Sequence, residues 1–252
     1  MTFDVAADAY ARFMGRYADP LAALFADWAG VRPGQRALDV GCGPGALTAE
    51  LVSRLGAEAV AAIDPSAPFV AATTTRFPEV DVRTGVAEDL PFPDATFDIA
   101  LAQLVVHFMD DPVAGLREMA RVTRPGGVVA ACVWDHAGDS GPLSLFWKVV
   151  HGLDPDAPGE AGLAGARQGH LVELCRTAGL RGVEDTRLTV AVRYTGFDEW
   201  WESFTLGVGP AGAYVTGLDA PEQETLRAAC AERLPPVSFE VSASAWAVRA
   251  RT

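Results

Sequence analysis

The stretch that most constrains the fold runs from Ala37 to Leu51, ALDVGCGPGALTAEL. A short apolar run ends in Asp39, glycines follow at alternate positions 41, 43 and 45, and an amphipathic segment begins at Ala46. Glycines in this pattern let the backbone turn sharply and let a ligand approach without meeting a Cβ. The free N–H groups and the positive dipole end of the following helix favour the same use. The stretch therefore predicts a strand, a turn and a helix that together cradle a ligand.

The chain has 252 residues, which suits one large domain, or one domain with an elaborated cap. Its 20 basic and 33 acidic side chains give a formal net charge of −13. Such an acidic surface repels phosphate backbones and anionic membranes, so nucleic acid is not an expected partner. No apolar run reaches the roughly 18 residues that span a bilayer, and no signal peptide is recognisable. Nothing in the sequence points to a particular oligomeric state.

The cysteines are scattered and form no CxxC pair: Cys42, Cys132, Cys175 and Cys230. Their spacing predicts neither a zinc site nor a disulfide framework. We expect them to be reduced and mostly buried, as in a cytoplasmic protein.

Short apolar segments alternate with amphipathic ones through the first half of the chain. After the strand at 37–40, further strands are expected over 60–64, 80–84, 97–104 and 128–133. All-apolar runs of this kind fit parallel strands that are covered on both faces. Strands that alternate with helices predict an α/β fold with a mostly parallel sheet and helices on both sides. Two later strands are expected at 188–194 and 237–250.

We expect a single domain over 1–252 with helical additions to its core. Two helices, over 4–17 and from Leu21, are separated at Asp19-Pro20 and form an N-terminal helical lid over 1–34. The cofactor-binding core covers 35–134, and helical cap insertions cover 137–170 and 196–235. The second insertion is short enough to be a lid over a site.

Asp64 ends the second expected strand, 21 residues after Gly43. In an open α/β sheet, ligands bind beyond the carboxyl ends of the strands, and a carboxylate at this offset accepts hydrogen bonds from ribose hydroxyls. The alternative is that Asp64 caps the next helix, with Pro65 as the first helical residue. The offset favours the ribose interpretation.

The glycine turn alone does not name the cofactor. The spacing Gly41-x-Gly43-x-x-Ala46 also satisfies the dinucleotide pattern, so an NAD(P)-dependent oxidoreductase is a rival hypothesis. Asp39 argues against it, because an anion there opposes a pyrophosphate and suits a cationic amine. The third glycine is Gly45 instead of a residue at position 46, and two helices precede the first strand.

Four blocks, in order and properly spaced, carry a family resemblance: LDVGCGPG at 38–45, AIDPS at 62–66, GVAEDLPFPDATFDIALAQ at 85–103, and LREMARVTRPGG at 116–127. With them the chain resembles the class I S-adenosylmethionine-dependent methyltransferases, in the small-molecule group similar to the ubiquinone/menaquinone methyltransferases. The resemblance implies a Rossmann-like, seven-stranded, mostly parallel sheet whose last strand is antiparallel. It also implies S-adenosylmethionine as methyl donor, S-adenosylhomocysteine as product, no metal, and a small-molecule acceptor. A protein that keeps this scaffold without transferring methyl groups is a further alternative.

The resemblance implies roles for individual residues of the cofactor site. Asp39 and the glycine turn would meet the methionine amine, Asp64 the ribose and Pro65 the adenine. Further cofactor contacts are implied for residues of the turn, of the loop after the third strand and of the end of the fourth strand: Gly41, Cys42, Gly43, Gly45, Ala87, Glu88, Asp89, Gln103 and Leu104. In YARFMGRY, Tyr10 and Arg16 match a segment that closes over the cofactor, where Arg16 would pair with its carboxylate. Simple packing is the alternative for Tyr10.

His107 follows the fourth strand at the edge of the expected site. Its unperturbed pKa near 6.5 suits a general base, which helps when the acceptor is a hydroxyl or an acidic carbon. The alternative is a histidine packed under the cap. His136 is a weaker candidate, and Asp110-Asp111 indicates a helix N-cap instead of a metal site.

Most aromatic residues of the expected cap fall at helical spacing, a pattern typical of core packing. They are Trp134, Phe146, Trp147, Trp200, Trp201 and Phe204. A cap rich in tryptophan also suggests an apolar or aromatic acceptor, methylated at oxygen, carbon or nitrogen.

Overall fold

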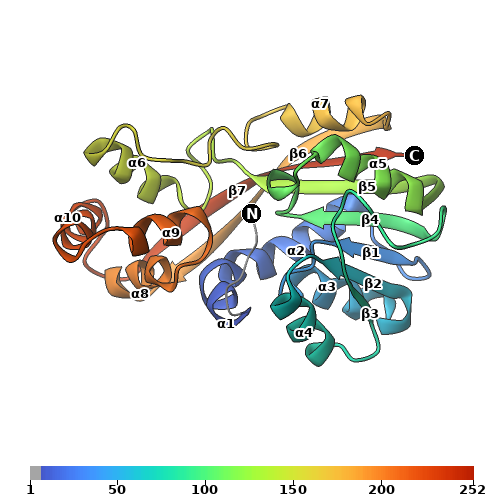
Figure 1. The fold of residues 1–252 in the computed structure, drawn as a ribbon, viewed down its shortest axis with the longest axis horizontal. Coiled ribbons are helices and arrows are strands. Elements are labelled where there is room, and N and C mark those ends of the chain that lie inside the picture. Colours follow the sequence, from blue (N-terminus) through green and yellow to red (C-terminus); the bar gives the residue numbers. More distant parts are fainter. Residues whose placement is uncertain (1–6) are drawn as a thin grey trace.

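The computed structural model describes residues 7–252 and consists of one seven-stranded sheet with helices on both faces (Figure 1). The start of the helix expected from Asp4 lies outside the described residues. The strand order is β3-β2-β1-β4-β5-β7-β6. The strands are β1 (Ala37–Val40), β2 (Val60–Asp64), β3 (Asp81–Thr84), β4 (Phe97–Gln103), β5 (Thr123–Trp134), β6 (Arg181–Tyr194) and β7 (Phe239–Arg251).

The first five strands pair in parallel, and β7 pairs antiparallel with both β5 and β6. This arrangement confirms the expected Rossmann-like sheet with its antiparallel last strand. Its carboxyl edge brings Asp64 and Gln103 to the same side as the end of β1. Alternate residues of the parallel strands enter two separate apolar cores, so that Ala37 and Ile99 face one and Leu38 and Ala100 the other.

Helices that alternate with the strands flank the sheet, as the sequence pattern predicted. They are α3 (Ala46–Leu55), α4 (Ala67–Arg76), α5 (Pro112–Val122) and α7 (His170–Thr177). Gly56 follows α3 as its C-cap, and Asp111 caps α5 by accepting from the N–H groups of Val113 and Ala114 at 3.0 Å. The N-cap prediction for Asp111 is therefore confirmed.

The N-terminal region is helical without the break expected at Asp19-Pro20. A short α1 (Ala7–Tyr10), a π turn (Ala11–Gly15) and α2 (Arg16–Ala29) follow one another, and Pro20 lies inside α2. The prediction of two helices was wrong because Tyr17, Leu21 and Phe25 bury one face of α2 almost completely. Such packing outweighs one hydrogen bond lost to a proline.

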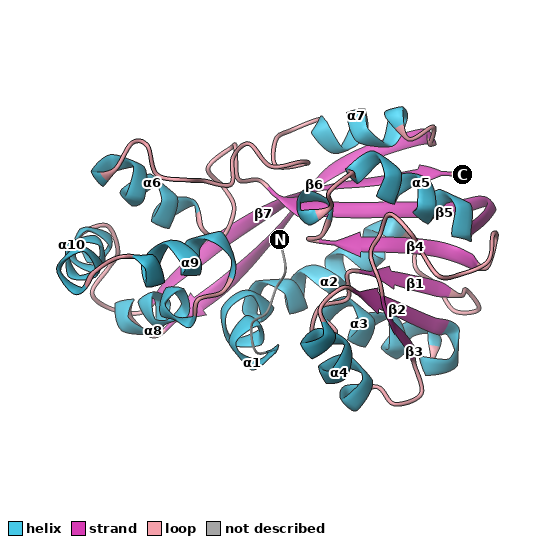
Figure 2. Cartoon of the chain, in the orientation of Figure 1, coloured by secondary structure: helices cyan, strands magenta, loops and turns pink. Residues whose placement is uncertain are grey.

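The cap lies beside the far ends of β6 and β7, with α1 between it and the core (Figure 1). It is entirely helix and loop apart from those strand ends (Figure 2). Its helices are α6 (Ser144–Leu153), α8 (Phe197–Glu202), a 3₁₀ turn (Ser203–Leu206), α9 (Gly209–Gly217) and α10 (Ala220–Ala231). The sequence pattern did not predict α9, whose glycines and small residues lack an apolar periodicity.

The aromatic residues of the cap form its core, as their spacing predicted. Phe146 stacks on Phe204 with ring centroids 4.4 Å apart, and Trp200 packs on Phe204 at 4.6 Å. All four cysteines are buried and unpaired, as expected. Within residues 7–252, no helix has the length and apolar character needed to cross a membrane.

Two strands begin earlier in the chain than their patterns predicted. β6 starts at Arg181 instead of 188, because its first half lies at the sheet edge with mostly exposed side chains and lacks an apolar signal. β5 starts at Thr123 instead of 128, and Thr123 pairs with Phe97.

Candidate active site

The glycine turn follows β1 directly and is held by backbone hydrogen bonds to β2. The N–H groups of Gly41 and Cys42 both donate to the carbonyl oxygen of Ile63, at 2.7 and 3.0 Å. Gly41 has a φ of +71°, and a Cβ added there would lie 2.4 Å from a methyl carbon of Val105. Gly43 has a φ of +53°, but a Cβ there would meet no atom within 4 Å. Position 41 thus needs glycine because a side chain would clash with Val105. At position 43, glycine leaves the backbone open to a ligand.

Asp64 joins the turn to the end of β2. One carboxylate oxygen accepts from the Gly43 N–H and the other from the Ser66 N–H, both at 2.8 Å. Helix α4 begins at Ala67 with Ser66 as its N-cap, so Asp64 is not the cap residue itself. Each oxygen of a carboxylate has room for a second donor, so Asp64 can still accept from two vicinal hydroxyls. Burial raises the pKa of Asp64, although both backbone hydrogen bonds oppose the rise.

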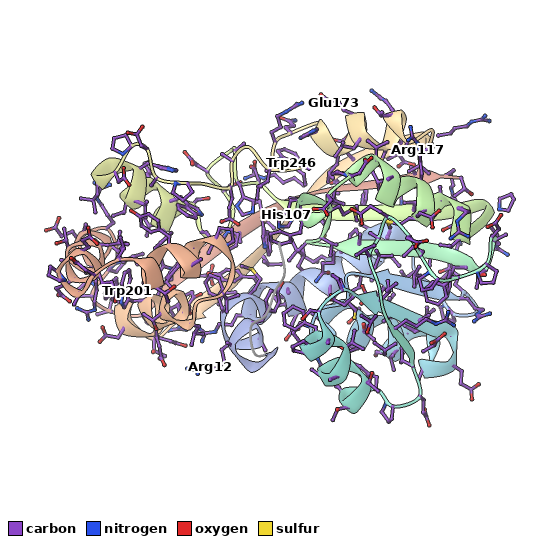
Figure 3. The ribbon with its side chains drawn as sticks, viewed as in Figure 1. Arg12, His107, Arg117, Glu173, Trp201 and Trp246 are labelled. Atoms are coloured by element: carbon purple, nitrogen blue, oxygen red, sulfur yellow. The ribbon has the colours of Figure 1, made fainter. Side chains whose placement is uncertain are left out.

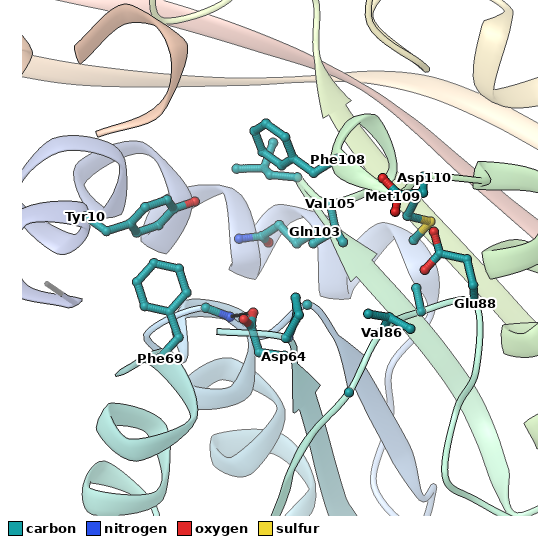
Figure 4. Close-up of a pocket in the computed structure, with 16 residues that line it drawn as sticks. Tyr10, Asp64, Phe69, Val86, Glu88, Gln103, Val105, Phe108, Met109 and Asp110 are labelled. Carbon is teal, nitrogen blue, oxygen red and sulfur yellow. Dashed lines mark hydrogen bonds between the residues drawn. The ribbon is translucent and has the colours of Figure 1, made fainter. Parts of the chain in front are cut away.

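A cavity of about 280 Å³ lies over this turn at the carboxyl edge of the sheet. Figure 4 shows Tyr10 and Phe69 on one side of it and Glu88, Met109 and Asp110 on the other. The cavity brings together most of the cofactor residues expected from the sequence: Tyr10, Gly41, Gly43, Asp64, Pro65, Ala87, Glu88, Gln103 and Leu104.

Five expected cofactor residues do not line the cavity. They are Arg16, Asp39, Cys42, Gly45 and Asp89. Cys42 is buried and Gly45 packs against Thr73 and Phe77 of the α4 region, so both support the turn from behind. Asp89 is exposed, and its neighbour Glu88 faces the cavity instead.

Arg16 is directed away from the cavity, toward the cap. Its guanidinium pairs with Glu199 of α8 and lies over the ring of Tyr194, 4.7 Å from the centroid. Beside it, the hydroxyl groups of Tyr17 and Tyr194 are 2.9 Å apart. The structure therefore does not place Arg16 where the resemblance implied, because Glu199 of the cap binds its charge.

Asp39 is buried beneath the turn. Its Oδ2 accepts from the Thr48 hydroxyl at 2.6 Å, and its Oδ1 has no hydrogen-bond partner among residues 7–252. Burial raises the pKa of Asp39 to about 7, and the negative charge of Asp64 adds to the rise, whereas the Thr48 hydrogen bond lowers it. A nearby cation would therefore stabilise the charged form of this carboxyl group.

The end of β4 supplies a second buried acceptor. Gln103 donates from Nε2 to the Ala18 carbonyl at 3.0 Å, while its Oε1 finds no partner in the described chain. Next to it, Leu104 has a φ of +63°, a left-handed conformation that is costly for a branched residue. Such strain at the edge of a cavity is typical of functional sites.

His107 lies in a short 3₁₀ turn (Val106–Phe108), at the boundary of core and cap (Figure 3). It does not line the large cavity but a chamber of about 30 Å³ next to it. The two spaces share Tyr10, Leu104 and Phe108 as walls. Burial lowers the pKa of His107 well below its usual value, and the nearby His136 lowers it further. His107 is therefore a neutral imidazole near pH 7.

Several wall residues of these spaces were missed from the sequence. Phe69, Val86 and Met109 line the cavity, and Glu160 lines the chamber. Glu160 lies in the glycine-rich segment between α6 and α7, where no periodicity points to burial, yet it is 4% exposed. In residues 7–252 no group of three His, Cys, Asp or Glu side chains is arranged to hold a metal ion.

The residues present fit S-adenosylmethionine. The free lone pairs of Asp64 match the ribose hydroxyls, and the unpartnered Gln103 oxygen is an acceptor suited to the methionine amine. Phe69 and Met109 offer apolar surface suited to the adenine ring, and Gly43 lets the cofactor approach the backbone closely.

Residues 38–131 match a family described as "Methyltransferase domain". A demethylmenaquinone methyltransferase of Mycolicibacterium paratuberculosis is 41% identical over 103 residues, which are 41% of this chain and 43% of the relative. The chain spans about half the length of the curated relatives it matches, or less.

Solved structures share the fold over most of the chain. A Bacillus halodurans protein assigned to the methyltransferases has a TM-score of 0.59 at 16% identity, covering 91% of this chain and 97% of that one. A [4+2]-cyclase has a TM-score of 0.56 at 23% identity, covering 92% of this chain and 80% of that one. Identities this low concern the fold alone. The sequence match over residues 38–131, the strand order and the glycine turn together support a class I methyltransferase.

Proposed function

We propose that this protein transfers a methyl group from S-adenosylmethionine to a small, mainly apolar or aromatic molecule. The observation that carries the proposal is the cavity in which Asp64, Gly43 and Gln103 converge, because its unfilled acceptors match the ribose and amine of this cofactor. The family match favours this methyl donor over a nicotinamide cofactor.

Bound S-adenosylmethionine supplies a methyl group already activated by a sulfonium. The protein then has to align the acceptor and exclude water. Tyr10 and Leu104 line both the cavity and the chamber, so they stand where donor and acceptor would meet. The apolar walls from Phe13, Met14 and Trp134 keep that meeting point dry.

We assign His107 as the general base of this reaction. Its neutral ring has an Nδ1 without a partner in the described residues and can accept a proton from the acceptor. The name of the Mycolicibacterium relative supports a quinol-like ring as one acceptor class for this chain.

Calorimetry and a labelling assay test the proposal. Titration with S-adenosylhomocysteine should give a clear binding signal, and NADH should give none; the reverse result would contradict the cofactor assignment. Labelled S-adenosylmethionine should then transfer its methyl group to a component of a metabolite extract. Binding of S-adenosylhomocysteine without any label transfer would favour a non-methylating enzyme, and the shared fold of a [4+2]-cyclase keeps that alternative in view.

A further inference from the structure

Three spaces adjoin one another from the cofactor cavity to the surface of the cap. The cavity and the 30 Å³ chamber share Tyr10, Leu104 and Phe108. On its other side the chamber shares His136 and Glu160 with a cleft of about 340 Å³. The chamber, at about 30 Å³, has room for about one hydroxyl group. The cleft has the size of a small-molecule site.

The outer cleft lies between α6 and the segment before α7. Ser144, Trp147, Lys148 and His151 of α6 form one wall, and Glu160 contributes to the other. Lys148 is exposed there and is the one lysine in the sequence. The cleft therefore meets the chamber at Glu160 and His136, which do not line the cofactor cavity.

Unpartnered polar groups concentrate along this route. Among the described residues, the buried atoms that lack a hydrogen-bond partner include Trp134 Nε1, His107 Nδ1 and His136 Nε2, and all three residues line the chamber. Ser144 Oγ, at the cleft, is a further one. Buried polar groups are normally satisfied, so such a cluster points to a ligand with polar atoms.

Glu160 is held in place at the junction of chamber and cleft. Its Oε2 accepts from the indole N–H of Trp147 at 2.7 Å, and its side chain is buried. This hydrogen bond fixes one carboxylate oxygen and leaves lone pairs of the group for another donor. A group that enters the chamber thus meets the acceptor Glu160 and the indole donor of Trp134 together.

A hydroxyl is the smallest organic group that both donates and accepts a hydrogen bond. We propose that the methyl acceptor enters through the cleft beside α6, and that Glu160 selects it by accepting a hydrogen bond from a phenol or enol hydroxyl. The hydroxyl end occupies the chamber next to His107, and the apolar body of the molecule lies in the cleft against Trp147. Glu160 holds the hydroxyl during binding. For methyl transfer the hydroxyl would turn to His107, which would accept its proton while the oxygen bonds the methyl carbon, the bond of that carbon to sulfur breaks and S-adenosylhomocysteine leaves. This inference rests on the proposed function and names the acceptor class of that site.

Glu160→Gln is the decisive variant, because a glutamine keeps the size and can still accept from Trp147. Asp156→Asn is the matched control, since Asp156 is an exposed carboxylate of the same segment that lines none of the three spaces. The probes are 2-naphthol and naphthalene-2-thiol, together with naphthalene as the member that lacks the group, assayed with labelled S-adenosylmethionine.

We expect methylation of 2-naphthol by the wild type, and for Glu160→Gln a KM at least tenfold higher with kcat changed less than threefold. The dissociation constant of S-adenosylhomocysteine should stay within twofold, and Asp156→Asn should behave as wild type. An unchanged KM in Glu160→Gln overturns the role of Glu160. Normal S-adenosylhomocysteine binding with no transfer to 2-naphthol, or with transfer only to the thiol, overturns the acceptor class. If the wild-type protein does not bind S-adenosylhomocysteine, the proposed function itself is contradicted.

Discussion

Two glycines of the same turn should fail in different ways when each is replaced by alanine. Gly41 and Gly43 both have a positive φ, so alanine costs about 1–2 kcal/mol of backbone strain at either position. At Gly41 the new Cβ would also lie 2.4 and 2.6 Å from the two methyl carbons of Val105. Overpacking of this kind costs about 1–3 kcal/mol more. We therefore expect Gly41→Ala to lose about 2–5 kcal/mol of unfolding free energy and Gly43→Ala about 1–2 kcal/mol.

Gly43→Ala should weaken cofactor binding more than Gly41→Ala does. A Cβ on Gly43 meets no protein atom within 4 Å and enters the cavity that Gly43 lines. Gly43→Ala should therefore weaken S-adenosylhomocysteine binding at least tenfold while the protein stays folded. Urea denaturation measures the free energies, and calorimetry measures the affinity.

The variant Val105→Ala provides the internal control. It removes the two methyl groups that clash, so the double variant Gly41→Ala/Val105→Ala should be more stable than the sum of the single effects by about 1 kcal/mol or more. Val105 is stiff at χ1 and does not move aside at low cost. A Gly41→Ala variant no less stable than Gly43→Ala, or a double variant without coupling, would refute this reasoning.

Three further changes probe the remaining groups of the site. His107→Ala should keep S-adenosylhomocysteine binding and lower turnover at least tenfold, and unchanged turnover would remove His107 as the base. Because the pKa of His107 is lowered, the acid limb of the wild-type pH–rate profile should lie below pH 6.5. The raised pKa of Asp39 means that the folded protein binds more protons than the unfolded chain between about pH 4 and pH 7, so unfolding free energy should fall as pH rises through that window. Asp39→Asn keeps an acceptor for Thr48 and should flatten this dependence in urea denaturation at pH 5 and pH 8, whereas an unaltered slope would show that another group titrates. Arg16→Gln should change S-adenosylhomocysteine affinity less than threefold, because Glu199 binds the guanidinium; a loss above tenfold in calorimetry would show that Arg16 turns to the cofactor.

The parts of the site that the sequence predicted are those fixed by neighbours along the chain. The glycine turn, Asp64 and Gln103 each end a buried strand, and parallel strands bring their carboxyl ends to one edge. Arg16 could not be placed in this way, because its partner Glu199 is 183 residues distant. Glu160 gave no signal either, since it lies in a segment without periodicity and its hydrogen-bond partner Trp147 is 13 residues away in the sequence.

The cofactor cavity and the acceptor chamber differ in the same way in how far the sequence predicts them. The family match covers 38–131, which contains the glycine turn, Asp64, Gln103 and His107. It ends before Trp134 and Glu160, and before the cap residues 208–210 that close the small chamber. The cofactor cavity is thus built largely by strand ends that the fold itself requires, whereas the chamber adds side chains from the N-terminal helix, the end of β5 and both cap insertions to Leu104, His107 and Phe108. A change of cap side chains can therefore alter the chamber without disturbing the strand ends that hold the cofactor. In the proposed reaction, the acceptor is therefore selected by Glu160 and its surroundings more than by residues of the matched segment 38–131.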